Sequence, residues 1–367
     1  MDGGSQHEIG DWNMQMMTRT RIATLMIVAG VAASQLMAQP EMPKAPEAPK
    51  LPDVPKFEVP KVEVPKVEVP KAPKVVKPMI EGDLVAMAAL VESTELTAVA
   101  TGMARTEGPL WHNGALYFTD MAKDSVYKTI PGTTPVDAPV VIKEKLGTPA
   151  GLAVDAKGVM YVSTFRKGVN TLAEDGTVTL VADKFEDKSF NGTNDIVIAV
   201  DGSQYFTDFG FTGRSQLQQS GVYRRAVDGK ITPVVTDFKQ ANGLAFSVDR
   251  KQLYVTEYNP DIRNIRVFDV KADGSLANGR VFATVDEERS VPDGVKVDVN
   301  GNVYVAAAGG VVIFDSAGKR IGKINAGPTS NLCFGGEDGK TLFLTGSGGV
   351  KSVKMKVAGA NLANSAK

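Results

Sequence analysis

Four residues with oxygen donors occur at the same position of a repeated sequence pattern. They are Glu107, Asn194, Asn242 and Asp293, and each directly precedes a short apolar strand pattern. Two carboxylates and two amides make an all-oxygen ligand set with a charge of −2. Hard oxygen ligands favour Ca²⁺ or Mg²⁺ over zinc or copper, and amide oxygens from four separate loops suit the flexible geometry of Ca²⁺. The four residues therefore predict a divalent-cation site, with Ca²⁺ favoured and Mg²⁺ as an alternative.

The composition excludes several other functions. Cys333 is the only cysteine, so the chain has no intrachain disulfide and no cysteine-cluster metal site. The 41 basic and 42 acidic residues give a net charge of −1. This balance gives no electrostatic reason to expect nucleic acid or an anionic membrane surface as a partner.

Six repeats position the four oxygen-bearing residues. Each repeat has a polar or small lead residue, a short apolar strand, a turn with Gly or Asp, and a second strand with an aromatic residue. The lead positions are 107, 150, 194, 242, 293 and 330, so successive repeats are 43, 44, 48, 51 and 37 residues apart. Repeats of this kind are typical of four-stranded blades, and six of them predict an all-β, six-bladed β-propeller. A seven-bladed ring with one degenerate blade is the alternative, although the sequence contains no seventh repeat.

The position of a residue within its repeat predicts its place in the ring. Blades are related by rotation about one axis, and the lead residue comes just before the strand that lines the central channel. We therefore expect the four oxygen-bearing lead residues to converge at one mouth of that channel. Ala150 and Ser330 hold the two remaining lead positions and offer little or no ligand capacity. Residues 96–101, ahead of the first repeat, are predicted to supply the strand that the last repeat lacks and so to close the ring.

The N-terminal region has a different composition. Arg19 and Arg21 precede an apolar run over residues 22–33, which has the length of a signal-peptide core. Residues 1–38 are therefore predicted to be a cleaved signal peptide, and an uncleaved membrane anchor reaching to about Ala38 is the alternative. In either case we expect an exported chain, and with cleavage a periplasmic or secreted protein without a transmembrane domain.

Residues 39–79 are predicted to be a disordered, proline-rich linker. Eleven prolines occur between residues 39 and 78, where a five-residue unit such as Val-Pro-Lys-Val-Glu recurs. Proline lacks a backbone donor and fixes φ, so the expected state is a polyproline II arm. The arm is either a spacer that contacts the cell envelope or disordered filler. The propeller is then assigned to residues 80–358 and a tail to residues 359–367.

Several fragments of the repeats are specific when they are taken together. They are Glu107-Gly-Pro-Leu-Trp111, Phe190-Asn-Gly-Thr-Asn-Asp195, Asp201-Gly-Ser-Gln-Tyr-Phe-Thr-Asp208, Asn242-Gly-Leu-Ala-Phe-Ser247, Pro292-Asp-Gly294 and Asn331-Leu-Cys-Phe-Gly-Gly336. These fragments resemble the senescence marker protein, regucalcin and gluconolactonase family. The resemblance implies a six-bladed propeller with one divalent ion, usually Ca²⁺ or Zn²⁺, that hydrolyses sugar lactones.

The resemblance also implies roles for individual residues. Glu107, Asn242 and Asp293 would bind the ion directly, and Asn194 would be a ligand or a contact to substrate and water. Gly192 and Thr193 stand where the family commonly has arginine or proline, which leaves the substrate open.

The predicted function is an exported, metal-dependent hydrolase that opens a sugar lactone or a similar cyclic ester with activated water. Asp293 is the predicted base because it is one of two acids in the lead set, and Asp195 is the alternative. The predicted substrate contacts are Asn191, Asn194, Phe209 and Phe211. A Ca²⁺-dependent phosphotriesterase or arylesterase on the same scaffold is one alternative function. A non-enzymatic binding propeller with a structural ion is the other.

Several further polar residues have structural interpretations. Asp120, Asp208 and Glu257 share a repeat position at the end of the second strand, where solvated strand ends are expected and support of the site residues is the alternative. His112 precedes an Asn-Gly turn and is expected at the surface, while Cys333 lies in an apolar run and is expected to be a buried thiol.

Overall fold

The computed structural model describes residues 79–210, 217, 219–287 and 290–360. All of these residues belong to the second of two units, which span residues 1–72 and 73–367. The predicted signal peptide, nearly all of the predicted proline-rich linker and most of the predicted tail lie outside the described residues and stay predictions. Within the described ranges, no helix is both long and apolar enough to cross a membrane.

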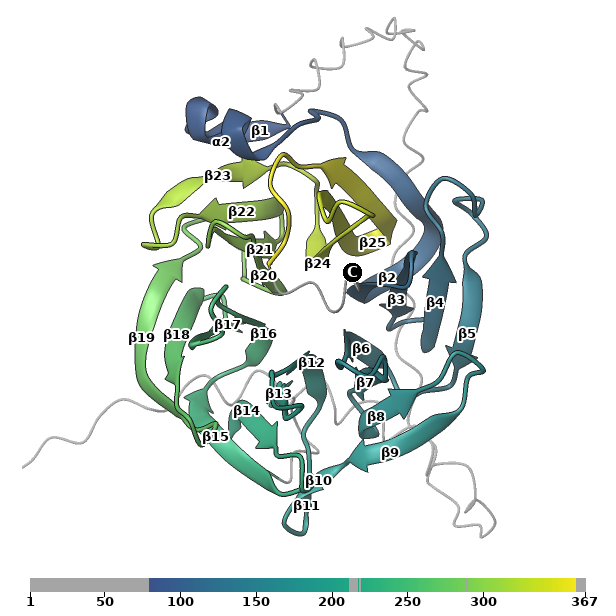
Figure 1. The fold of residues 1–367 in the computed structure, drawn as a ribbon, viewed down its shortest axis with the longest axis vertical. Coiled ribbons are helices and arrows are strands. Elements are labelled where there is room, and N and C mark those ends of the chain that lie inside the picture. The colour runs from purple at the N-terminus through teal and green to yellow at the C-terminus, as the bar shows by residue number, and fades with distance from the viewer. Residues whose placement is uncertain (1–78, 211–216, 218, 288–289, 361–367) are drawn as a thin grey trace, which may run out of the picture. The chain divides into compact units, whose positions relative to one another are not determined.

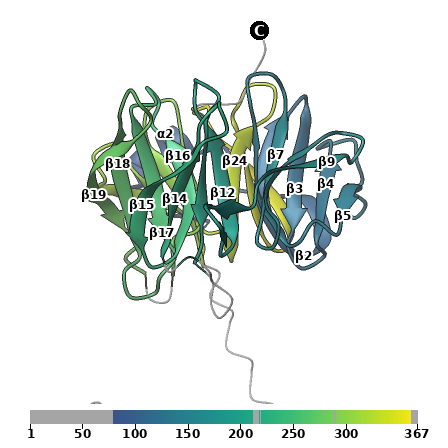
Figure 2. The same ribbon diagram turned by 90° about the horizontal axis from the view of Figure 1, so that it is seen from below.

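The described unit is an all-β propeller whose antiparallel sheets surround a central axis (Figures 1 and 2). The second, third and fourth repeats each form a four-stranded sheet. The second repeat contains β6 (Pro149–Val154), β7 (Met160–Thr164), β8 (Gly168–Leu172) and β9 (Val178–Ala182). The third contains β12 (Thr193–Ile198), β13 (Gln204–Asp208), β14 (Ser220–Arg225) and β15 (Ile231–Phe238). The fourth contains β16 (Ala241–Phe246), β17 (Gln252–Glu257), β18 (Asn264–Val270) and β19 (Leu276–Thr284).

The fifth repeat forms a five-stranded sheet because an N-terminal strand joins its outer edge. The repeat contributes β20 (Val295–Val297), β21 (Val303–Ala307), β22 (Gly310–Phe314) and β23 (Arg320–Ile324), and the added strand is β1 (Ile80–Gly82). The short helix α2 (Leu84–Leu90) follows β1, and a small hairpin of β10 (Lys184–Phe185) and β11 (Lys188–Ser189) precedes the third repeat.

The first and last repeats share one continuous six-stranded sheet. Its strands are β24 (Thr329–Gly335), β25 (Thr341–Lys354), β2 (Thr97–His112), β3 (Ala115–Asp120), β4 (Ser125–Thr129) and β5 (Val140–Glu144). The first part of β2 pairs with β25, and the part from Thr106 onward pairs with β3. The prediction that a strand ahead of the first repeat joins the last repeat is therefore confirmed.

The prediction of six separate blades is corrected by this sheet. The described residues form five sheets of four or more strands, because β2 runs unbroken from the last repeat into the first. The repeats themselves are retained at the axis, where β2, β6, β12, β16, β20 and β24 each pack against the next and β24 packs against β2. Apolar side chains fill the space between neighbouring sheets; Tyr205, Leu244 and Phe268, for example, pack together between the third and fourth repeats.

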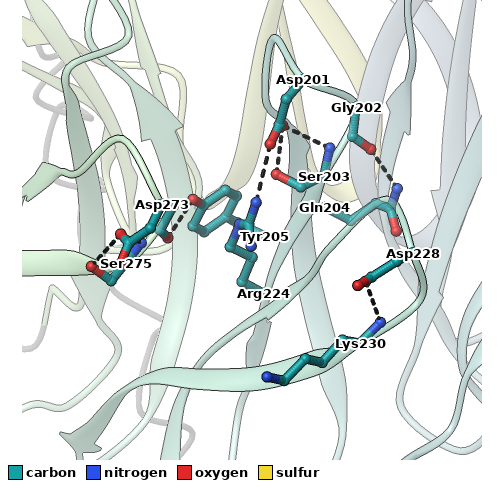
Figure 3. A network of polar contacts seen from close by, with 11 residues as sticks. Asp201, Gly202, Ser203, Gln204, Tyr205, Arg224, Asp228, Lys230, Asp273 and Ser275 are labelled. Atoms are coloured by element: carbon teal, nitrogen blue, oxygen red, sulfur yellow. Dashed lines mark hydrogen bonds and ion pairs between the residues drawn. The ribbon is translucent and has the colours of Figure 1, made fainter.

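A polar network connects the third and fourth repeats (Figure 3). It lies near the C-terminal end of β12, whereas Asn194 lies near the start of that strand. The Tyr205 hydroxyl donates to the Gly274 carbonyl oxygen at 2.6 Å, and this bond is buried. The Arg224 guanidinium pairs with Asp201 at 3.0 Å and lies 5.8 Å from the centre of the Tyr205 ring. The network holds the turns of this face together, so the starts of the inner strands project from a fixed scaffold at the other face.

Candidate metal and substrate site

The starts of the inner strands bring the four predicted ligands to one end of the central channel. Glu107, Asn194, Asn242 and Asp293 are all buried, with exposed fractions of 3, 5, 3 and 8%. Burial and the Glu107 carboxylate raise the pKa of Asp293, and the side chain of Asn242 lowers it. Glu107 and Asn242 therefore both lie near Asp293, and binding of an ion by these residues stays a prediction.

A ring of hydroxyl groups fixes the backbone of the lead residues. In four successive repeats a hydroxyl donates to the lead carbonyl oxygen of the next repeat. The pairs are Thr119 with Ala150 at 2.9 Å, Ser163 with Asn194, Thr207 with Asn242 at 2.7 Å, and Thr256 with Asp293 at 2.6 Å. Three of these hydroxyls also accept the N–H that follows the lead residue in their own repeat, at 2.7–3.0 Å. The carbonyl groups of these four lead residues are thus each held in place by the preceding repeat.

Three acids hold the loops that lead into the inner strands, and the expectation that they are solvated was wrong. Asp120, Asp208 and Glu257 are at most 3% exposed. Each accepts the N–H groups of the residues two and three positions before a lead residue, at 2.7–3.1 Å. Burial raises the pKa of Asp208 to about 6, although the N–H groups of Gly192 and Asn191 oppose the rise. These carboxylates satisfy backbone donors that would otherwise be buried without partners.

The residue after each lead position faces the channel axis, and this position contains a site residue that the sequence analysis missed. The position holds glycine in four repeats, Asp195 in the third and Asn331 in the sixth. A Cβ atom on Gly151 would lie 2.9 Å from Asp195 Oδ1, and one on Gly294 would lie 2.1 Å from Asn331 Oδ1. The four glycines therefore leave the axis to Asp195 and Asn331. A column reading Gly, Gly, Asp, Gly, Gly, Asn was the sequence signal that could have identified Asn331.

Asn331 joins two of the site carboxylates. Its Nδ2 donates to Glu107 Oε2 at 3.1 Å and to Asp195 Oδ1 and Oδ2 at 2.9 and 3.1 Å. Gly108 N–H also donates to Glu107 Oε2, at 3.0 Å. Within the described part of the chain, no hydrogen bond reaches Glu107 Oε1.

Three buried carboxylates stand close together at this end of the channel. Burial and the Asp195 carboxylate raise the pKa of Glu107 to about 7. Burial, Glu107 and Asp195 raise the pKa of Asp293 well above its ordinary range. The Arg105 guanidinium opposes the rise in pKa of both Asp293 and Glu107. Burial also raises the pKa of Asp195, which the Lys296 ammonium group and Asn331 oppose. Each carboxylate is thus destabilised as an anion, and a cation among them would relieve that cost.

The donor set fits a divalent cation. The Oδ1 atom of Asn242 is buried and no described residue gives it a hydrogen bond, which leaves its lone pairs available to a metal ion. Among the described residues, no group of three or more His, Cys, Asp or Glu side chains has metal-binding geometry. A cation here would therefore need the amide oxygens of Asn194 and Asn242 beside the carboxylates, and the ligand set stays a prediction.

The predicted substrate contacts lie on the same face. Neither side-chain atom of Asn191 has a hydrogen-bond partner by geometry, although the amide is near enough to lower the pKa of Asp208. Phe209 follows Asp208 directly and is 5% exposed. Phe211 lies outside the described residues. The structure thus sets Asn191 and Phe209 beside the loops that Asp208 holds and leaves their contact with substrate as a prediction.

His112 lies away from this face, at the other end of the inner part of β2. It is buried rather than exposed as expected, with its Nδ1 atom unpartnered. Cys333 is a buried free thiol, as expected, and burial raises its pKa to about 12.

A chamber of about 350 Å³ occupies the channel beyond the Asp195–Asn331 pair. All six inner strands line it, and its walls include Trp111, Phe246 and Lys296, whereas the four predicted ligands do not line it. The pair of polar side chains at the axis therefore separates the predicted ion site from the remainder of the channel.

Comparisons with known proteins agree with the resemblance. The profile of the SMP-30/gluconolactonase/LRE-like region matches residues 105–348. The chain is 29% identical to a gluconolactonase of Zymomonas mobilis over 73% of its own length and 83% of the relative. It is 27% identical to the pentonolactonase XacC of Haloferax volcanii over 70% of this chain and 86% of the relative.

Solved structures show the same architecture. A gluconolactonase from Xanthomonas campestris superposes with a TM-score of 0.69 at 27% identity, covering 77% of this chain and 96% of that one. A calcium-binding protein, regucalcin, from Agrobacterium tumefaciens shares the fold with a TM-score of 0.60 at 18% identity, covering 75% of this chain and 97% of that one.

Proposed function

Because the chain belongs to the SMP-30/gluconolactonase/LRE-like family, we propose that it is a hydrolase that opens a sugar lactone or a related cyclic ester. We further propose that it depends on a divalent cation, with Ca²⁺ favoured, held by Glu107, Asn194, Asn242 and Asp293. The observation that carries the proposal is the cluster of three buried carboxylates with raised pKa values next to the unpartnered Oδ1 of Asn242. The names of the gluconolactonase and pentonolactonase relatives support a sugar lactone as substrate.

A bound divalent cation supplies positive charge that polarises the lactone carbonyl oxygen and stabilises negative charge developing on it. Asp293 accepts a proton from the attacking water, whose oxygen bonds to the carbonyl carbon as the ring C–O bond breaks. The proton that Asp293 accepted passes to the departing ring oxygen, so the product is a hydroxy acid and Asp293 is restored. Asp195 positions its neighbours and does not take the proton from water, because Asn331 donates to both of its carboxylate oxygens. Asn191, Asn194 and Phe209 contact the substrate beside these acids.

The test is a panel of substrates assayed with and without a chelator. The panel contains δ-gluconolactone, a pentonolactone, an unsubstituted δ-lactone, an aryl ester and a phosphotriester. Lactone hydrolysis that is lost on chelation and restored by Ca²⁺ is expected. Preferential hydrolysis of the phosphotriester or aryl ester would replace the proposed substrate class. Inactivity on the whole panel with Ca²⁺ bound would favour a binding propeller.

We also propose that the protein acts outside the cytoplasm, in the periplasm or as a secreted protein, with the proline-rich residues 39–79 as a spacer. The proposal is supported by the apolar run over residues 22–33 behind Arg19 and Arg21. Cell fractionation and N-terminal sequencing of the mature protein test it. Recovery of the intact N-terminus in the cytoplasm would overturn it.

A further inference from the structure

Three aromatic residues occupy one backbone position in successive repeats of the site face. Phe165 N–H donates to the Thr148 carbonyl oxygen, Phe209 N–H to that of Gly192, and Tyr258 N–H to that of Gln240, at 2.9–3.0 Å. Each acceptor lies two residues before a lead position. The three aromatic residues are therefore related by the rotation of the repeats and lie at the same height as the loops that carry the predicted ligands.

The rings of these three residues form a continuous row, which we call the aromatic wall. The ring centres of Phe165 and Phe209 are 5.8 Å apart, and those of Phe209 and Tyr258 are 5.5 Å apart. Phe209 is buried between its two neighbours, which are both partly exposed. The wall therefore presents the outer rings as an apolar surface that the central ring supports.

One end of the aromatic wall adjoins the predicted ion site. Burial raises the pKa of Tyr258, and the carboxylates of Asp293 and Glu107 raise it further. The Tyr258 hydroxyl is thus within electrostatic range of two predicted ligands. A lactone with its carbonyl group at the ion site would have its ring and substituents beside the wall.

At the Phe165 end of the wall, residue 192 provides no polar side chain that could contact a substrate. Residue 192 is glycine, and a Cβ atom there would lie 2.8 Å from Cδ1 of Phe165. The Phe165 ring therefore occupies the space into which a longer side chain at residue 192 would extend. Among the described residues of this face, the groups that are buried without a hydrogen-bond partner include the Asn191 amide, Asn242 Oδ1 and Ser290 Oγ. Asn242 and Ser290 belong to the fourth and fifth repeats, so the Asn191 amide is the one such group next to Gly192 at the Phe165 end of the wall.

We propose that the aromatic wall of Phe165, Phe209 and Tyr258 selects lactones with an apolar face or an alkyl substituent over polyhydroxylated lactones. The inference rests on the proposed lactone hydrolysis and, of the two substrate classes proposed there, favours the related cyclic ester over the sugar lactone. Burial of an alkyl group against the wall stabilises the bound lactone, whereas a hydroxyl set against it loses hydrogen bonds to water without replacement. Phe165 is the specificity-determining residue, because it fills the space above Gly192.

The experiment compares kcat/KM for δ-valerolactone, δ-decalactone and δ-gluconolactone in the full-length protein with Ca²⁺. The first two differ by a pentyl chain, and because δ-valerolactone releases a primary alkoxide and δ-decalactone a secondary one, the ratio of the two activities is compared between variants. Wild type is expected to prefer δ-decalactone. In Phe165→Ala, the loss of kcat/KM should be about ten times larger for δ-decalactone than for δ-valerolactone, which is the size expected when an apolar contact is removed. The loss should appear mainly as a higher KM. Phe165→Leu should recover most of the difference, because it restores apolar area.

Met121→Ala is the matched control. Met121 N–H donates to the Arg105 carbonyl oxygen at 2.9 Å, so Met121 occupies the same backbone position in the first repeat, outside the aromatic wall. This variant should leave the ratio of the two lactone activities unchanged. Equal losses on both lactones in Phe165→Ala, or a wild-type preference for δ-gluconolactone, would overturn the inference while leaving lactone hydrolysis intact.

A binding measurement separates failure of the inference from failure of the proposed function. Calorimetry with δ-valerolactam and its pentyl-substituted analogue does not require turnover. Tighter binding of the substituted lactam that is lost in Phe165→Ala would support the wall even if no lactone is hydrolysed. Equal binding of the two lactams to wild type would refute the wall.

Discussion

Replacement of Asn331 tests whether this residue holds the two carboxylates at the axis. Asn331→Leu keeps the approximate volume of the side chain but removes the Nδ2 donor to Glu107 and Asp195. A hydrogen bond to a charged group contributes about 1.5–3 kcal/mol, so loss of the donor for two buried carboxylates should cost about 3–6 kcal/mol when both are ionised. This is a large part of the stability of an ordinary domain, which is about 5–15 kcal/mol.

The loss should depend on pH in one direction. The folded-state pKa of Glu107 is about 7, above its ordinary value of 4.5, and the pKa of Asp195 is also raised. Glu107 is therefore largely protonated in the folded, cation-free protein near pH 5, where Asn331 donates to a neutral Glu107, and the raised pKa of Asp195 acts in the same direction. The loss should be about 1 kcal/mol there and should reach its full size above the folded-state pKa, near pH 8.

Urea denaturation in the presence of a chelator, at pH 5 and pH 8, measures both values. Asn302→Leu is a matched control far from the site: Asn302 Nδ2 donates to one buried carboxylate, Asp298, at 2.8 Å. Asp298 keeps the Tyr304 hydroxyl at 2.9 Å, so this control should lose less stability at pH 8 than Asn331→Leu. Equal losses at the two pH values in Asn331→Leu would refute the assigned role.

Three further predictions concern the ion and the N-terminal region. Exhaustive chelation should abolish activity and lower the melting temperature, because a ligand at 100 times its dissociation constant stabilises the folded state by about 2.7 kcal/mol; an unchanged melting temperature would contradict an ion at the channel mouth. Asp293→Asn should weaken Ca²⁺ binding, and activity should stay about 10²-fold low in excess Ca²⁺ if Asp293 is the base. Asn242→Asp, which adds a charge at an equivalent position, should tighten binding, and full activity of Asp293→Asn at ordinary Ca²⁺ would exclude both roles for Asp293. Deletion of residues 39–77 should leave kcat/KM within a few-fold, and a larger loss with intact folding would show that this segment reaches the site.

The repeat positions predicted the inner strands and the convergence of Glu107 with Asp293, because rotation of equivalent segments fixes height and radius. They could not predict the role of Asn331. A register shift occurs in the inner strands at the lead position, as between Thr193 and Ile196 and between Thr329 and Asn331. Alternation of side chains fails at such an irregularity, so the channel-facing residue can be the lead residue or its neighbour.

The burial of Asp120, Asp208 and Glu257 was missed for a different reason. An acid at a strand end is usually solvated, and its actual partners are N–H groups of a loop about 17 residues away in sequence. Only the packed sheet brings them together. The six-stranded sheet was missed because the sequence marks repeats, whereas sheet boundaries depend on whether the strand between them breaks, and β2 does not break.

The continuity of β2 has a consequence for the order of folding. Three sheets pair segments that are neighbours in sequence, but Thr106 Oγ1 bonds to the backbone of Gly346 across 240 residues. Contacts of such separation form late, because the entropy of closing a long loop must be overcome before they contribute. The ring can therefore close only after nearly the whole chain has been synthesised. A nascent or C-terminally truncated chain would hold the first part of β2 as an unpaired edge, which is the surface through which such chains associate with one another.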